Sequence, residues 1–370
     1  MSRPDGTGFE FGTVGEADLP QVAAFLSGQD LSGSPGAWEA TSSPGVDAVK
    51  RDLDWRFARN PCSDPDGILG YCIRRTDGTL KGVLLCLASR FALEDRILLG
   101  LCGCGFYVEP ELRLQAFLLF HRFLKTPGSD FVFATTCNQA SGALWSKLGG
   151  KAVRDSRCEY LFPVRPGPII EELLLRKGVG RLAGALGRAV GRIVPRRASW
   201  KRAGRNLRLS PCRDWERLAD LAGRHRDPSV LTTHRAPDYL EWRYDRTPAR
   251  SSNEVLVFDD GKGNQGWVAL AESRRGRTRQ IRTWTLLDLT YPRARFELRD
   301  LLGAVLRRFS ERADMITIRG PERLGQAAVA LGARRREFPA PLSYITARGG
   351  QSDALARSVE LFPADGDTVS

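Results

Sequence analysis

The sequence predicts an α/β protein of the α+β kind, with two similar halves that each form a mixed, mostly antiparallel sheet flanked by helices. The first observation is a repeated motif, because residues 55–61 and 242–248 share the pattern W-R-[FY]-x-R-x-P. The second is that the predicted strands and helices follow in the same order around both copies. A repeat of this kind indicates two structural units of one design.

The composition is that of an ordinary globular protein. The 370 residues are 42% hydrophobic and 27% charged, which excludes disorder as the dominant state. No apolar run is long enough to span a membrane, and the N-terminus lacks the apolar core of a secretory signal. The eight cysteines show no paired framework and no repeated CxxC. We therefore expect reduced thiols, a cytoplasmic location and no metal site.

The positive charge is concentrated in one segment. The chain has a net charge of +13, and residues 165–208 hold twelve basic and two acidic residues, so this segment alone contributes +10. A protein that binds DNA over its whole surface is therefore not indicated. The segment predicts the following division: a first domain over 1–164, a basic amphipathic linker over 165–205, a second domain over 206–349 and a disordered tail over 350–370.

The linker carries a helical stripe of apolar residues at steps of three and four, with glycines that weaken the helix. The stripe consists of Leu175, Val179, Leu182, Leu186, Val190 and Ile193. Such a helix needs a surface to remain folded. That surface is the protein itself, an anionic membrane or RNA, and a membrane contact would place the protein at the inner face of the inner membrane.

The residue pattern of each half predicts the same order of elements: strand, helix, three strands, helix, strand, helix and two strands. In the first half the elements are expected at 9–14, 18–27, 69–75, 81–91, 97–108, 111–125, 130–136, 139–148, 152–154 and 158–164. In the second half they are expected at 206–210, 214–224, 254–258, 266–271, 280–289, 295–311, 315–319, 321–331, 334–338 and 342–347. Gly turns at 77–78 and 261–263 predict the two hairpins.

This order, with two local motifs, resembles the GNAT (Gcn5-related N-acetyltransferase) fold. Residues 108–113, V-E-P-E-L-R, resemble the V-x-P-E-[YL]-R end of that family's fourth strand. Residues 136–150, T-C-N-Q-A-S-G-A-L-W-S-K-L-G-G, resemble the N-x-x-[AS]-x-x-L-[YFW]-x-K-L-G-F motif after the fifth strand. The whole chain is most similar to two-domain acetyltransferase-like proteins of bacterial polysaccharide gene clusters, in which WR[FY]xxxP segments also occur.

The resemblance implies that acetyl-CoA or another acyl-CoA binds where the fourth and fifth strands separate. The pyrophosphate would lie at the N-terminus of the following helix, where backbone N–H groups are unpaired. The cofactor-binding residues expected in the first half are Val108, Arg113, Gln115, Ala116, Asn138 and Trp145. Asn138 would bind the pantetheine arm or cap the helix at 139–148, and both interpretations stand equal.

The sequence departs from the family's glycine-rich phosphate loop in both halves. Ala116 replaces the first glycine and Leu118 the second small residue, and we expect a Leu side chain to crowd the pyrophosphate. The second half has no glycine there, Pro321 stands in place of Asn138, and Ala328 stands in place of Trp145. We therefore expect the acyl-CoA site in the first half.

Two residues near the end of the fourth strand are candidates for catalysis, which needs a base to deprotonate the attacking amine or hydroxyl. Glu109 is the candidate base, with surface charge as its structural alternative, and Tyr107 is the second candidate, with a core role as its alternative. The position of Trp145 often carries a Tyr acid in the family, and an indole cannot replace it. His234, with Arg235 and Asp238, would reach an acceptor pocket or serve only the fold.

Three functions agree with these features. The first is an acyltransferase that moves an acyl group from acyl-CoA to an amine or hydroxyl, on a small molecule or a glycan such as a polysaccharide precursor. The second is a binding protein that keeps the fold and has lost the cofactor. The third, by a more distant resemblance, is a Fem-like transferase that uses aminoacyl-tRNA, with the basic linker as its RNA contact.

Overall fold

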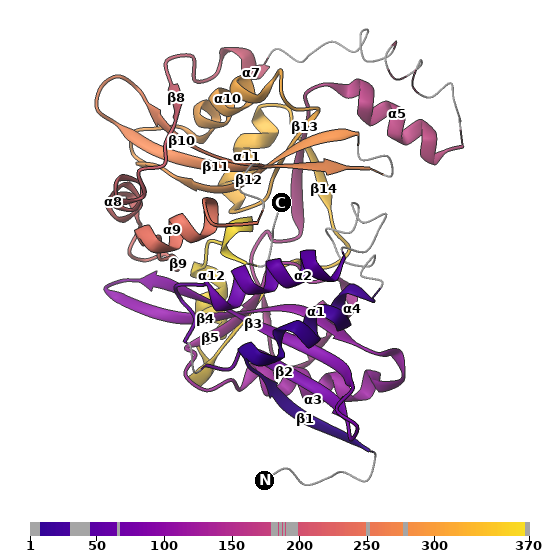
Figure 1. Ribbon diagram of the computed structural model, residues 1–370. Coiled ribbons are helices and arrows are strands. Elements are labelled where there is room, and N and C mark those ends of the chain that lie inside the picture. Colours follow the sequence, from indigo (N-terminus) through magenta and orange to yellow (C-terminus); the bar gives the residue numbers. More distant parts are fainter. Residues whose placement is uncertain are drawn as a thin grey trace.

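The chain forms two sheets, one above the other, with helices on the faces of both (Figure 1). The structure is a computed structural model that describes residues 8–29, 45–64, 67–178, 199–248, 252–276 and 280–366, with residues 184, 187 and 189 of the linker. Both sheets are mixed and mostly antiparallel, as the sequence predicts.

The first sheet has the strand order β1-β2-β3-β4-β5-β15-β6, and a short strand, β9, pairs with β3. Its strands are β1 (Phe9–Val14), β2 (Gly70–Arg75), β3 (Leu80–Leu93), β4 (Arg96–Val108), β5 (Phe131–Ala134), β6 (Lys151–Ala152), β9 (Thr232–Thr233) and β15 (Tyr344–Ala347). The long apolar run at 97–108 forms the central strand β4, which pairs in parallel with β5.

The second sheet has the strand order β14-β7-β13-β12-β11-β10-β8. Its strands are β7 (Cys158–Pro163), β8 (Arg208–Pro211), β10 (Asn253–Asp259), β11 (Gln265–Arg275), β12 (Ile281–Thr290), β13 (Met315–Ile318) and β14 (Arg334–Glu337). β12 is the counterpart of β4 and pairs in parallel with β13. The sheets therefore repeat one design.

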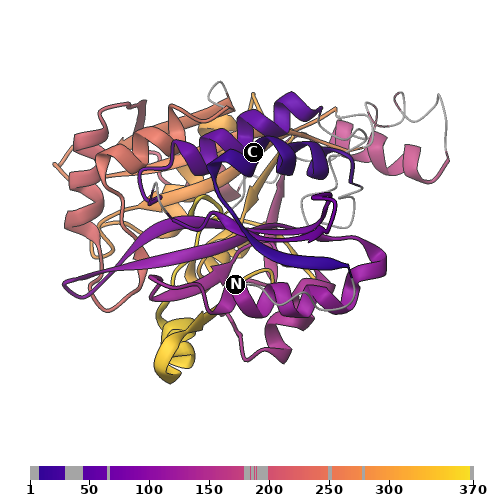
Figure 2. The ribbon, with the colours of Figure 1, turned by 60° about the horizontal axis from the view of Figure 1, so that its bottom comes forward.

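Helices cover both faces of each sheet. Figure 2 shows the first sheet between the indigo helices on one side and the purple helices on the other. The helices of the first half are α1 (Leu19–Ser27), α2 (Val46–Leu53), a π-helical turn η2 (Asp54–Ala58), α3 (Arg113–Leu124), α4 (Gln139–Lys147) and α5 (Pro166–Arg176). Those of the second half are α7 (Ser199–Arg202), α8 (Trp215–His225), α9 (Pro237–Tyr244), α10 (Leu298–Phe309), α11 (Glu322–Ala330) and α12 (Ser352–Ser358).

The two halves exchange their last strands, which the sequence did not predict. β7 belongs by sequence to the first half, but it lies between β13 and β14 of the second sheet. β15 belongs to the second half, and it lies between β5 and β6 of the first sheet. The expected limits at 164 and 206 therefore do not separate the two sheets, because each sheet is completed by a strand from the other half.

The linker and the tail also differ from the expectation. α5 ends at Arg176 and is followed by Gly178 with φ +82°, a left-handed conformation that closes a helix. Of the expected apolar stripe only Leu175 is described, and its other members lie outside the described residues. The tail was expected to be disordered, but residues 352–358 form α12 and residues 363–365 form a buried turn, η6. Its apolar residues, such as Phe362, are buried between the halves, and this burial orders the segment.

Both copies of the W-R-[FY] motif are helical, and they meet at the centre of the molecule. The indoles of Trp55 in η2 and Trp242 in α9 stack with centroids 4.9 Å apart. Trp55 Nε1 donates to the carbonyl of Trp242 at 3.0 Å, and Trp242 Nε1 donates to the carbonyl of Trp55 at 2.8 Å. The Arg243 guanidinium lies 5.5 Å from the Trp55 ring centroid. The repeated motif therefore joins the two halves in the core.

Each fourth strand carries a bulge, beyond which it leaves the fifth strand. In β4 the register shifts opposite Val83–Leu85, and Gly105 takes φ +56°. In β12 the register shifts opposite Ala269–Leu270. The last parallel pairs are Cys102–Phe133 in the first half and Leu286–Ile318 in the second. Each half thus has a site where two parallel strands separate.

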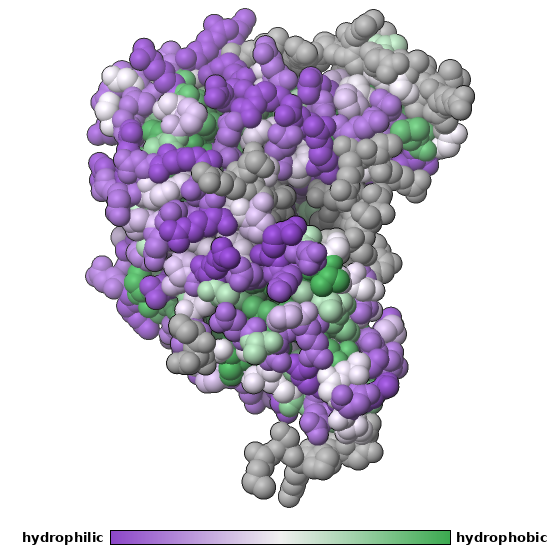
Figure 3. All heavy atoms as spheres, viewed as in Figure 1, coloured by the Kyte–Doolittle hydropathy of each residue, from purple (hydrophilic) through white to green (hydrophobic). Residues whose placement is uncertain are grey.

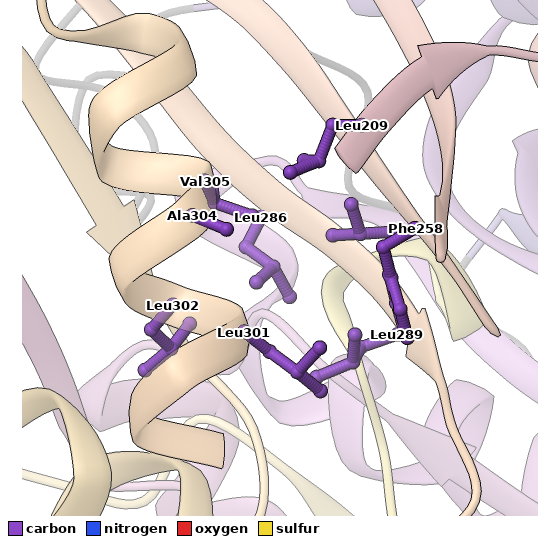
Figure 4. A pocket seen from close by; sticks show the side chains of 9 residues that line it. Leu209, Phe258, Leu286, Leu289, Leu301, Leu302, Ala304 and Val305 are labelled. Carbon is purple, nitrogen blue, oxygen red and sulfur yellow. The ribbon is translucent and has the colours of Figure 1, made fainter. Parts of the chain in front are cut away.

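The second half is filled with apolar side chains beneath α10. Leu209, Phe258, Leu289, Leu301 and Val305 converge from β8, β10, β12 and α10 around a narrow seam that has no room for a water molecule (Figure 4). No polar side chain lines this seam. The space between β12 and α10 is therefore a packed core and offers no donor to a ligand.

Within the described ranges, no helix is both long and apolar enough to cross a bilayer. On the face shown in Figure 3, hydrophilic residues dominate the second half, while hydrophobic patches are scattered over the first.

Loss of either central indole should destabilise the whole protein. We expect Trp55→Ala and Trp242→Ala each to lower the free energy of unfolding by about 3–5 kcal/mol, because each removes a buried ring and leaves a buried carbonyl without its donor. The double variant should cost less than the sum, because the rings contact each other. Urea unfolding followed by circular dichroism measures this, with Val329→Ala, at a position 50% exposed, as control. Additive losses would contradict the coupling.

Candidate functional site

The strand separation of the first half is open, and that of the second is closed. Past the bulge in β4, Gly105 is exposed and residues 106–108 are partly exposed. The corresponding residues 287–290 of β12 are all buried. The edge of β4 that faces away from β3 has no strand partner beyond Cys102. The first half therefore presents an accessible strand end, residues 105–108, which is called its groove below, while the corresponding strand end of the second half is buried.

Both expected catalytic residues lie along this open segment of β4. Tyr107 is half-buried, and its ring meets the edge of Phe25 on α1 at a centroid distance of 5.8 Å. The Glu109 carboxylate accepts two hydrogen bonds from Lys81 Nζ, at 2.7 and 3.0 Å. Use of Glu109 as a base would therefore require the acceptor to displace Lys81 from this partly buried ion pair.

The helix expected to bind the pyrophosphate begins beside this groove. A 3-10 turn, η3 (Pro110–Leu112), leads directly into α3, and the N-cap residue Leu112 provides no side-chain cap. Val108 ends β4, Arg113 is exposed at the start of α3, and Ala116 is half-buried in its first turn. The Gln115 Oε1 atom is buried without a hydrogen bond.

Three apolar side chains of α3 are exposed on the face opposite its buried residues. Leu114 is 87% exposed, Phe117 42% and Leu118 48%. Leu118 was expected to crowd the pyrophosphate, and its exposure shows that the side chain projects into solvent.

The two remaining residues expected to bind the cofactor have structural roles. Asn138 Oδ1 accepts from the Ser141 backbone N at 2.9 Å and Ser141 Oγ accepts from the Asn138 N at 3.0 Å, which forms a capping box on α4. Trp145 is 2% exposed and packs among Phe120, Phe123 and Tyr344. Their contact with a cofactor stays a prediction, whereas the cap and the core packing are observed.

A buried ion pair closes the strand separation of the second half. Asp288 of β12 is 1% exposed and accepts from Arg235 Nε at 2.7 Å and Nη2 at 2.6 Å. The Tyr244 hydroxyl donates to the same carboxylate at 3.3 Å. Burial opposes the charge on Arg235, but the pair with Asp288 outweighs it and raises the pKa of Arg235 above its ordinary value. Sequence reasoning missed Asp288, because it lies 53 residues from its partner.

A second buried carboxylate, Asp365, anchors the C-terminal segment to this pair. Its Oδ2 accepts from the Phe362 backbone N at 2.6 Å, and its Oδ1 lies 3.9 Å from Arg235. Burial raises the pKa of Asp365 to about 6, and the charge of Asp288 adds to this shift while Arg235 opposes it. Phe362 packs against Gly320 at the end of β13. The protein's own chain therefore fills the space that a ligand would take.

The largest of three cavities lined by described residues lies between the halves, beside the end of β12, with a volume of about 310 Å³. His234 and Arg235 line it, as the acceptor-pocket hypothesis expected, whereas Asp238 is not among its lining residues. None of the eight residues expected in the donor site lines any of these three cavities. Within the described ranges, no group of His, Cys, Asp or Glu side chains could hold a metal ion.

Comparison with known proteins finds similarity in structure alone. No protein-family model and no curated sequence matches the chain. An Enterococcus faecalis V583 protein described as a probable N-acyltransferase has a TM-score of 0.56 at 10% identity, over 92% of this chain and 72% of that one. A GCN5-related N-acetyltransferase from Anabaena variabilis has a TM-score of 0.52 at 11% identity, over 94% and 75%. Saccharomyces cerevisiae N-myristoyltransferase with bound myristoyl-CoA has a TM-score of 0.51 at 10% identity, over 92% and 78%.

The chain therefore has a tandem GNAT fold, and the expected fold class is confirmed. In the first half the strand separation is open beside an uncapped helix N-terminus, while in the second it is filled by Arg235, Asp288 and the C-terminal segment. Of the two strand ends, only that of the first half is accessible within the described residues.

The cap formed by Asn138 can be tested apart from ligand binding. We expect Asn138→Ala to lower the free energy of unfolding by about 0.5–2 kcal/mol, because the Ser141 N–H loses its acceptor. Asn138→Asp should retain most of the stability, because a carboxylate also caps. Thermal unfolding of the three proteins measures this. Equal stability of Asn138→Ala and the original chain would show that the cap contributes nothing.

The raised pKa of Asp365 makes stability depend on pH. Because its pKa is about 6 in the folded chain and lower when unfolded, its ionisation penalises folding increasingly between pH 4 and pH 6 and fully above. We expect Asp365→Asn to raise the free energy of unfolding at pH 7.5 by on the order of 2 kcal/mol, and to change it little at pH 4. Urea unfolding at the two pH values measures this. A loss of stability at pH 7.5 would show that the ionised carboxylate is favourable.

Proposed function

We propose that this protein is an acyl-CoA-dependent acyltransferase whose donor site is the groove of the first half. The observation that carries this proposal is the contrast between the two fourth strands: residues 105–108 of β4 remain accessible, whereas residues 287–290 of β12 are buried. Structures with the same fold include proteins described as acyltransferases and one with bound myristoyl-CoA, and this supports acetyl-CoA or another acyl-CoA as the donor.

The backbone would supply most of the chemistry in this groove. Backbone N–H groups of the unpaired edge of β4 would hold the thioester carbonyl and stabilise the negative charge that develops on its oxygen. The uncapped N-terminus of α3, with Arg113, would hold the pyrophosphate. An amine or hydroxyl of the acceptor would attack the carbonyl carbon. Glu109 or Tyr107 would be the group that takes the proton of the attacking amine or hydroxyl. The thiolate of CoA would then leave.

The acceptor that we propose is an amine or hydroxyl on a small molecule or glycan. The proposal that this acceptor is a polysaccharide precursor is based only on the resemblance of the WR[FY]xxxP segments. The separate proposal that residues 165–208 contact an anionic membrane or RNA is based on their net charge of +10.

A binding protein without catalytic activity is the second candidate, and one observation favours it. Trp145 stands where the family often has a Tyr acid, and its indole is buried among aromatic rings. Unlike the binding protein considered from the sequence, which has lost the cofactor, this candidate still binds acyl-CoA but does not turn over the thioester with any acceptor.

The test is calorimetric titration with acetyl-CoA and longer acyl-CoAs. We expect saturable binding to one site, weakened about tenfold or more by Ala116→Glu, because a carboxylate in the first turn of α3 repels the pyrophosphate. Val329→Glu, which adds the same charge at an exposed position of α11, should leave the affinity unchanged.

The absence of both heat and thermal stabilisation at millimolar acyl-CoA would overturn the proposal. Equal weakening by both substitutions would place the binding outside the groove. Release of CoA on addition of amines or sugars distinguishes the enzyme from the binding protein.

A further inference from the structure

The cavity between the two halves is a built feature with a polar wall. The β3–β4 hairpin approaches it from the first half, and the end of α8, β9 and the end of β12 enclose it from the second. Its volume of about 310 Å³ is large enough for a small metabolite. Ile97 at its edge lies eight residues before Gly105 along β4, roughly 26 Å away. The cavity is thus distinct from the donor groove.

Two hydrogen bonds fix the hairpin over the cavity. Glu94 N donates to the Pro228 carbonyl at 2.7 Å, and Arg226 Nη2 donates to the Glu94 carbonyl at 2.5 Å. Glu94 takes φ +52°, which is unfavourable for a residue other than glycine. A strained residue held by contacts between the halves indicates that this wall has a fixed geometry.

The carboxylates on the opposite wall are already paired with arginines. Glu360 accepts from Arg293 at 3.1 Å and from Arg323 at 2.7 Å. Asp227 pairs with Arg293 at 3.0 Å and also accepts from the Ser229 hydroxyl at 2.7 Å. These acidic groups therefore have little negative charge left to attract a cation.

Arg226 on the near wall forms no ion pair in the described part of the chain, and its Nη1 is buried without a hydrogen bond. Glu94, Asp95 and Arg96 of the hairpin also line the cavity, and the observed bond from Arg226 to this hairpin goes to the Glu94 backbone and not to a carboxylate. The only observed partner of Arg226 is the neutral Glu94 carbonyl. A partly buried guanidinium with an unused donor favours an anionic partner.

Two imidazoles line the same cavity. His225 Nε2 lies 2.9 Å from the Gln265 carbonyl, and because a carbonyl only accepts, the proton is on Nε2 and Nδ1 carries a lone pair. The ring of His234 forms no hydrogen bond with the described residues. Burial lowers the pKa of His234, and the charges of Arg90, Arg226 and Arg235 lower it further while Asp238 opposes them. The charges that act on the pKa of His234 are thus three arginines and one carboxylate, Asp238.

We propose that this cavity binds a small anionic ligand, a phosphate or carboxylate group, with Arg226 as its charged anchor and His234 beside it. The ligand would supply the negative charge that Arg226 lacks. It would also favour the protonated form of His234, since an anion beside an imidazole stabilises imidazolium. By linkage, the anion should bind more tightly as the pH falls through the pKa of His234.

Histidine-selective NMR of the full chain tests this, because the sequence contains only three histidines: His121, His225 and His234. The probes are inorganic phosphate and acetate, each titrated at constant ionic strength with chloride as the balancing anion. We expect saturable shifts of His234 and His225 with at least one probe, no shift of His121 on α3, and a higher His234 pKa at saturation. A response to one probe identifies a phosphate or a carboxylate ligand.

The substitutions separate a specific site from general charge effects. We expect Arg226→Gln to weaken the binding about tenfold or more, and Arg226→Lys to weaken it less. Arg224→Gln removes an exposed arginine of α8 that does not line the cavity, and it should leave the affinity for the anion unchanged. Shifts that are not saturable, that include His121, or that survive Arg226→Gln would overturn the proposal. The result is independent of the donor groove, since no acyl-CoA is present.

Discussion

The contact between Trp55 and Trp242 is the interaction on which the architecture depends. Each indole donates to the backbone of the other half, so neither half can satisfy its own buried N–H and carbonyl groups at this position. Burial of an unpaired polar group costs free energy. The exchange of β7 and β15 acts in the same direction, because each sheet is incomplete without a strand from the other half. The two halves therefore form one folding unit.

The repeated design gives two strand separations, and they have diverged in one physical respect. In the first half, β4 is left with an open backbone edge. In the second, the space is taken by the buried Arg235–Asp288 pair, by Asp365 and by Phe362. A buried ion pair is weak evidence for added stability, because its desolvation offsets its attraction. Its effect here is to close a groove and to fix the C-terminal segment between the sheets.

The C-terminal segment that closes the strand separation of the second half also lines the cavity between the halves. It contributes Glu360 and Phe362 to that cavity, and Glu360 forms ion pairs with two arginines there. The first half thus keeps an accessible strand end at residues 105–108, and the polar cavity lies roughly 26 Å from it along β4.

The sequence by itself determined the elements and their order, because periodicity, caps and turns are local. The run at 97–108 predicted β4, found at 96–108, and the cap of α4 by Asn138 was one of two interpretations left open. The sequence did not show the helical form of the W-R-[FY] motif or the strand exchange. It also did not show that Asp288 and Asp365 are buried beside Arg235. Trp55 and Trp242 lie 187 residues apart, and Arg235 and Asp288 lie 53 apart. Such partners are chosen by the packing of the two halves, so only the tertiary structure decided which groove is open and where the charges meet.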